Sequence, residues 1–293
     1  MADGGVPILE SARAGYAFMR ASLRTVAPAA VMFAAATALA GVAAPAPGSN
    51  AAGAEIISLV ATMASILFGL AYSAFTYRLA LRNDASGFFG LKIGRDESNL
   101  LGAAIVVGFF FLIVIVVCIV IFSIALLPAA AQAKVDLGSV APGDKAALLE
   151  AFGAIFKGPG GPYLIAIALG LAGFIIWLSL RLFLVYVATI AEGRIMAFST
   201  WGWTKGDTLR ILAAAMIVLF PIALVIGLSL AVLGQVLGTS AFGDAAGMFL
   251  QALAQNLFLA PAASGLAVFL YRGLRPPDLD LTKPPAAKTG QTP

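Results

Sequence analysis

The chain has no histidine, a single cysteine and very little charge. Among its 293 residues, Asp, Glu, Lys and Arg together make up 11%, whereas apolar residues make up 61%. Soluble domains carry roughly 25% charged residues, and so little charge cannot cover that much apolar surface in water. The missing histidine excludes a Ser-His catalytic pair and a Cys/His metal site, and Cys118 can form no disulfide within the chain. The composition therefore predicts a membrane protein.

The few charges lie at the ends of long apolar runs. When these runs are taken as six crossings, every Lys and Arg except Lys134, Lys145 and Lys157 falls on one side of the membrane. Cytoplasmic loops retain Lys and Arg during insertion, so this asymmetry predicts that both termini are cytoplasmic. The net charge of +4 is spread along the headgroup level and forms no dense basic cluster. We therefore expect membrane lipids as partners, and not nucleic acid.

The apolar runs predict an all-α, polytopic helical bundle. Residues 1–24 are expected to form a cytoplasmic amphipathic lead helix, residues 25–272 a six-span transmembrane domain, and residues 273–293 a disordered cytoplasmic tail. We expect the crossings at about 25–44, 55–79, 100–130, 163–183, 209–237 and 248–271. A cleaved signal peptide is the alternative for the N-terminus, because Ala38-Leu39-Ala40 resembles a cleavage site, although the lead is long for a signal.

The outer loop after the third crossing contains a second amphipathic segment. From Asp144 to Lys157, five apolar residues recur at helical spacing: Leu148, Leu149, Phe152, Ile155 and Phe156. This segment is expected to lie flat on the outer leaflet. Docking of a membrane-protein partner is the alternative.

The return crossings suggest a threefold internal repeat. They end at Arg78, Arg181 and Arg272, and Phe75-Thr-Tyr77-Arg78 resembles Phe269-Leu-Tyr271-Arg272. The pattern is compatible with three tandem helical hairpins in the same orientation. The alternative is that any cytoplasmic helix end selects an aromatic residue and an arginine, which reach the headgroups.

Polar and aromatic residues are densest after the fourth crossing. The string Ser199-Thr-Trp201-Gly-Trp203-Thr-Lys205 combines indole rings, which prefer the interface, with a cation that can meet a phosphate. An ordinary aromatic belt with snorkelling cations is the alternative. The predicted lipid-headgroup residues are Arg181, Glu192, Arg194, Trp201, Trp203 and Lys205.

The last two crossings carry features typical of a small cavity. Pro221 and Pro261 each remove a helix hydrogen bond near mid-membrane and bend their helices. Gln251 and Gln255 share a face, and Asn256 follows them. Bent helices beside a polar face can line a cavity, as in transporters. Kinks that serve packing, and hydrogen bonds between helices, are the alternatives.

Carboxylates are few and peripheral. Asp96 and Glu97 are adjacent in a predicted cytoplasmic loop, and no pair of acids lies within a crossing. This argues against a proton relay or a buried cation site. We therefore predict no catalytic residue, no metal site and no cofactor.

Two stretches carry a family resemblance. They are Ala188–Gly206, with Glu192-Gly-Arg194 and Trp201-Gly-Trp203-Thr-Lys205-Gly206, and the N-terminal Ile8-Leu-Glu-Ser-Ala-Arg13-Ala-Gly-Tyr16. Together with the six-helix layout, they resemble a broad group of bacterial membrane proteins similar to the membrane domain of glycerophosphoryl diester phosphodiesterases. The resemblance implies a bacterial inner-membrane protein. The soluble phosphodiesterase domain, with its metal-binding acids and histidines, is absent from the sequence, so the resemblance implies no catalytic activity.

These features predict a non-enzymatic inner-membrane protein that engages lipid headgroups or membrane partners through cytoplasmic interface helices. The alternatives are a transporter of a small or amphiphilic solute and a structural subunit of a larger membrane complex.

Overall fold

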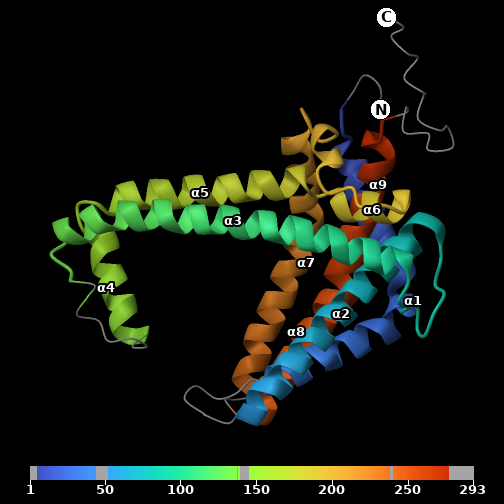
Figure 1. Ribbon diagram of the computed structural model, residues 1–293, viewed down its shortest axis with the longest axis horizontal. Helices are drawn as coiled ribbons and strands as arrows, with labels where there is room; N and C mark the ends of the chain where they lie inside the picture. The colour runs from blue at the N-terminus through green and yellow to red at the C-terminus, as the bar shows by residue number, and fades with distance from the viewer. Residues whose placement is uncertain (1–4, 44–51, 137, 139–144, 238–239, 277–293) are drawn as a thin grey trace, which may run out of the picture. The chain divides into compact units, whose positions relative to one another are not determined.

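The computed structural model describes residues 5–43, 52–136, 138, 145–237 and 240–276, and their regular structure is helical. Six segments of these residues are long and apolar enough to cross a membrane, so the predicted all-α, multi-pass membrane fold is confirmed. Most of the predicted tail, residues 277–293, lies outside the described residues. The helices in Figure 1 are α1 (Ile8–Val42), α2 (Ala52–Arg82), α3 (Arg95–Gln132), α4 (Lys145–Lys157), α5 (Gly161–Arg181), α6 (Val185–Glu192), α7 (Thr208–Leu237), α8 (Ala241–Ala254) and α9 (Ala260–Leu274).

The chain packs as two compact units. The first combines the residues up to Ala103 with those from Leu182 onward, and the second is Ala104–Arg181. The second unit has its own small core, in which Ile155 of α4 is fully buried against residues of α3 and α5. The amphipathic outer helix predicted from the sequence is therefore present. Its apolar face does not lie wholly on the leaflet, because Ile155 packs into the protein while Leu149 remains exposed.

Helix α1 is central to the first unit, where it packs against α2, α7, α8 and α9 (Figure 1). The structure differs from the predicted lead helix, since residues 8–24 continue into the first span as one 35-residue helix. No glycine or proline interrupts residues 17–27, so nothing in the sequence ends the helix there. Small buried residues in this segment allow other helices to approach closely. They are Ser11, Ala12, Gly15 and Ser22.

The irregularity expected at Pro261 takes the form of a π turn. A five-residue π segment, η3 (Gln255–Leu259), joins α8 to α9 just before this proline. Proline lacks an N–H and its ring collides with the carbonyl four residues earlier, and a wider turn relieves that collision. Pro221 lies within α7 and is exposed on its surface.

Close packing of α1 on α9 generates a test at Gly265. A Cβ atom there would lie 2.6 Å from the Cβ of Phe18 and 3.1 Å from the carbonyl oxygen of Ala14. We expect Gly265→Ala to lower the free energy of unfolding by about 1–3 kcal/mol, because one of the helices must shift. Unfolding by SDS in mixed micelles, followed by circular dichroism, measures this change.

The matched control is Gly227→Ala in α7, where an added Cβ has no neighbour within 4 Å. It should leave stability unchanged or raise it slightly, since alanine favours helix over glycine. Equal stability of the two variants would contradict the close α1–α9 contact.

Candidate functional site

The first unit contains a fully buried arginine near the end of α2. Arg78 is 0% exposed, and its guanidinium forms an ion pair with Glu97 in the first turn of α3. It also donates a 2.9 Å hydrogen bond to the carbonyl oxygen of Gly90 and lies 3.7 Å from the Asp84 carboxylate. A buried charge is tolerated only when it is paired and hydrogen-bonded. Arg78 therefore ties the end of α2, the following segment and the start of α3 together.

The segment that connects α2 to α3 is held in turn by Asp84. This carboxylate accepts hydrogen bonds from the backbone N–H of Ser86 at 2.9 Å and from Nζ of Lys92 at 3.3 Å. The hydrogen bonds from Ser86, and then that from the Lys92 ammonium, hold the pKa of Asp84 well below its usual range. Asp84 therefore stays charged at neutral and mildly acidic pH, and the segment keeps its ion pairs there.

A tight turn within the same segment depends on Gly90. Its φ of +83° is a conformation that glycine adopts without strain, and a Cβ atom at this position would run into the ring of Phe75. The backbone N–H of Leu91 donates to the carbonyl oxygen of Phe88 at 3.0 Å across the turn. The turn thus places the Gly90 carbonyl on Arg78 and turns the chain back toward α2.

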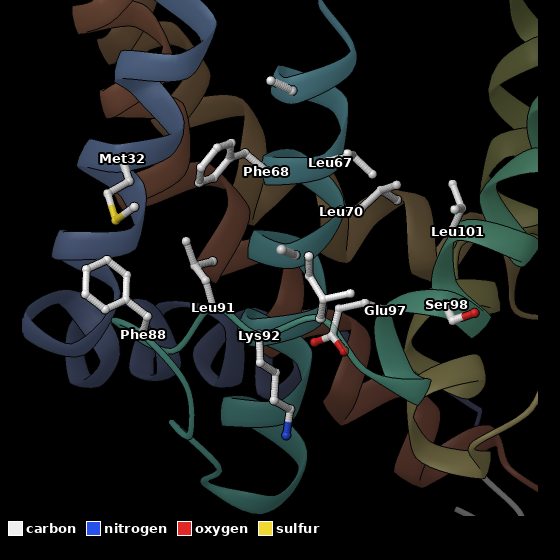
Figure 2. A pocket seen from close by; sticks show the side chains of 13 residues that line it. Met32, Leu67, Phe68, Leu70, Phe88, Leu91, Lys92, Glu97, Ser98 and Leu101 are labelled. Carbon is white, nitrogen blue, oxygen red and sulfur yellow. The ribbon is translucent and has the colours of Figure 1, made fainter. Parts of the chain in front are cut away.

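An apolar groove of about 740 Å³ lies against this connecting segment. Met32 of α1, Phe68 of α2 and Leu91 of the connection contribute apolar walls. The polar lining residues Lys92, Glu97 and Ser98 lie together at one end, with Glu97 between the other two in Figure 2. The groove is therefore amphipathic, with an apolar body and a polar end beside the Arg78 ion pair.

Glu97 presents one carboxylate oxygen that the protein does not satisfy. Its Oε1 binds Arg78, whereas Oε2 is buried and has no hydrogen-bond partner among the described residues. The side chain as a whole is only 7% exposed. A buried acceptor left unpaired costs roughly 1–3 kcal/mol. The polar end of the groove thus contains an acceptor that a donor from a bound molecule would stabilise.

The structure brings only some of the predicted headgroup residues together. Glu192 accepts a hydrogen bond from the Tyr271 hydroxyl and forms a 3.0 Å ion pair with Arg275, and its side chain is 2% exposed. The ring of Trp203 lies 6.1 Å from that of Tyr271. Both predicted residues thus meet α9, and Glu192 is engaged inside the protein.

The other headgroup candidates are placed differently. Arg194 and Lys205 are exposed in the first unit, and Trp201 is partly buried there. Arg181 ends α5 in the second unit, with its guanidinium over the ring of Trp177 at 5.5 Å. It therefore belongs to a separate body from the other five candidates.

The predicted cavity residues do not line one cavity. Gln251 lines a second pocket, of about 410 Å³, together with residues of α7 and α8, whereas Gln255 and Pro221 are exposed and lie in neither of the two pockets described. Asn256 is buried and donates from Nδ2 to the carbonyl oxygen of Ala252 at 2.7 Å. Pro261 is buried in α9. Gln251 alone among the five therefore borders a described pocket.

Sequence reasoning missed the ion pair and the groove beside it. Asp96 and Glu97 were expected in a peripheral loop, but they lie in the first turn of α3, where Glu97 is buried. A usable signal was present in the sequence. Between residues 78 and 97, four cations and three acids lie on either side of a glycine-containing turn, in a chain with little charge elsewhere: Arg78, Arg82, Asp84, Lys92, Arg95, Asp96 and Glu97.

The buried ion pair generates a test of stability. Glu97→Ala should lower the free energy of unfolding by on the order of 3 kcal/mol, because it leaves the Arg78 guanidinium buried beside a more distant carboxylate. Replacing both residues, as Arg78→Met with Glu97→Met, should cost less than Glu97→Ala, since no buried charge remains unpaired.

Unfolding in mixed micelles of the single and double variants measures this coupling. A matched control is Asp96→Ala, whose partner Arg82 has a side chain that is 48% exposed. If Glu97→Ala is no more destabilising than this control, the buried pair does not have the role described here.

Comparison with known proteins returned no match of this chain to a protein-family model, a curated protein or a solved structure. The resemblance to phosphodiesterase membrane domains therefore remains a prediction, and the functional argument depends on the chain's own residues.

Proposed function

We propose that this membrane protein binds a single phospholipid in the groove between α1, α2 and the α2–α3 connection, and that it has no enzymatic activity. The observation that carries the proposal is the amphipathic lining of the groove: apolar walls on the spanning helices, and Lys92, Glu97 and Ser98 at one end. A phospholipid has the same division into apolar chains and polar headgroup. Pockets of roughly 300–1,000 Å³ bury most of a small ligand, so this groove suits the headgroup region and the first part of the acyl chains.

The position of the groove along the chain supports the same conclusion. Its polar end lies where α2 ends and α3 begins, and these helix ends carry cations, as helix ends at a headgroup layer do. By the charge asymmetry of the sequence, this layer is the cytoplasmic one. We therefore place the protein in a bacterial inner membrane with both termini in the cytoplasm, in keeping with the resemblance noted above.

A second, weaker lipid contact is proposed around η2 (Ser199–Gly202) and the residues that flank it. Arg194 and Lys205 are exposed there beside Trp201 and Trp203. Exposed cations next to interfacial indole rings attract anionic headgroups without forming a deep site. This surface would hold lipids at the periphery of the protein, whereas the groove would hold one specific lipid.

Blocking the groove provides the main test. Ala64 lines the groove from α2, so Ala64→Phe should fill part of it. Thr62→Phe adds a ring to the same helix at an exposed position that does not line the groove. In native mass spectrometry of the purified full chain, mixed with a defined phospholipid, we expect one retained lipid for the native sequence and for Thr62→Phe. Ala64→Phe should lose that lipid, and equal retention by all three proteins would contradict the proposal.

The peripheral contact is tested by Arg194→Gln combined with Lys205→Gln. This double variant should retain fewer anionic lipids beyond the first, because about 1 kcal/mol of attraction is lost for each surface cation. Retention of the first lipid should not change. If the first lipid is lost with the others, the groove is not the primary site.

A further inference from the structure

We propose that the groove selects a phospholipid whose headgroup carries an N–H donor, as a phosphoethanolamine headgroup does. This inference rests on the proposed lipid-binding function and names the headgroup that the same groove recognises. The geometry at Glu97 and the position of Lys92 each contribute one requirement.

The first requirement is a hydrogen-bond donor. Glu97 lines the groove, and only 7% of its side chain is exposed. Its Oε2 has no hydrogen-bond donor among the described residues. Because Oε1 is already bound to Arg78, Oε2 is the carboxylate oxygen left for a further donor. An ammonium N–H is the donor that pairs best with a carboxylate, since the hydrogen bond is charge-assisted. A headgroup without an N–H or O–H leaves this oxygen unsatisfied.

The second requirement is a phosphate near Lys92. The Nζ of Lys92 donates to Asp84 at 3.3 Å and to Ser86 at 3.1 Å, and an ammonium has three donors. One donor is therefore left for a phosphate oxygen at the rim of the groove, and in Figure 2 the Lys92 ammonium extends away from the Glu97 carboxylate. The order of charges in the site, cation at the rim and carboxylate beyond it, matches a phosphate followed by an ammonium.

A series of N-methylated lipids removes the N–H donors of the headgroup stepwise while its net charge stays constant. The series has four members: phosphatidylethanolamine, its N-methyl derivative, its N,N-dimethyl derivative and phosphatidylcholine. All four have the same net charge, and they are chosen with the same acyl chains. Only the last has no N–H. Native mass spectrometry of the full chain with pairs of these lipids in competition measures their relative retention. We expect retention of the three N–H lipids to exceed that of phosphatidylcholine by about tenfold or more, the effect of one charged hydrogen bond.

Two variants test whether Glu97 and Lys92 recognise the headgroup or only support the structure around the groove. Glu97→Gln removes the negative charge at nearly constant size, and the difference between the N–H lipids and phosphatidylcholine should fall to about twofold or less. The readout is a ratio of two lipids on the same folded molecules, so a loss of folded protein does not alter it. Lys92→Met should weaken retention of every phospholipid in the series by a similar factor and leave that ratio intact.

The outcomes distinguish this inference from the proposed function. If all lipids are retained equally by the native chain and lost equally on Ala64→Phe, the groove binds lipid but the headgroup inference is wrong. If lipid retention does not depend on Ala64→Phe, the proposed function itself fails. A preference for N–H lipids that survives Glu97→Gln would also overturn the inference, since the donor would then be recognised elsewhere.

Discussion

Burying Arg78 obliges the chain to place acceptors and negative charge around one guanidinium. Glu97 and Asp84 supply the charge, and the carbonyl of Gly90 supplies a further acceptor. These three partners come from the twenty residues that end α2 and begin α3, so satisfying the arginine fixes the path of the chain between the two helices. The same path forms the polar end of the groove, because Lys92 and Glu97 belong to the ion-pair network and to the groove lining. The groove is thus a consequence of how the charge is buried.

The other helices of the first unit are held together by hydrogen bonds and close packing, which depend little on the hydrophobic effect. Between membrane helices, close packing and hydrogen bonds replace the hydrophobic effect. Ser264 donates to Thr76 at 3.1 Å between α9 and α2, and the Tyr72 hydroxyl donates to the backbone carbonyl of Asn256. These bonds use the buried polar groups of α2, η3 and α9 within the protein.

The spanning segments could be predicted from the sequence, whereas the site could not. Crossing a membrane depends on the apolar content of about twenty consecutive residues, which is a local property. The partners of Arg78 and Tyr271 are not local: Glu97 lies 19 residues from Arg78, and Glu192 lies 79 residues from Tyr271. Arg78 and Arg272 both end a return crossing. Arg78 is buried, whereas Arg272 forms an exposed hydrogen bond to the carbonyl oxygen of Leu81. Hydropathy treats both as snorkelling cations, because the difference lies in which acids fold back onto each one.

The two oxygens of Glu97 differ in whether the protein supplies them with a hydrogen-bond donor. Oε1 binds Arg78 and would be required with or without a ligand, whereas Oε2 has no hydrogen-bond partner among the described residues and carries the cost of an unmet acceptor, roughly 1–3 kcal/mol. A headgroup donor that meets Oε2 removes that cost, so lipid binding and the stability of the α2–α3 connection are thermodynamically linked. On this argument a bound headgroup with an N–H donor would complete the polar end of the groove. The folded protein would then be most stable in a membrane that supplies such a headgroup.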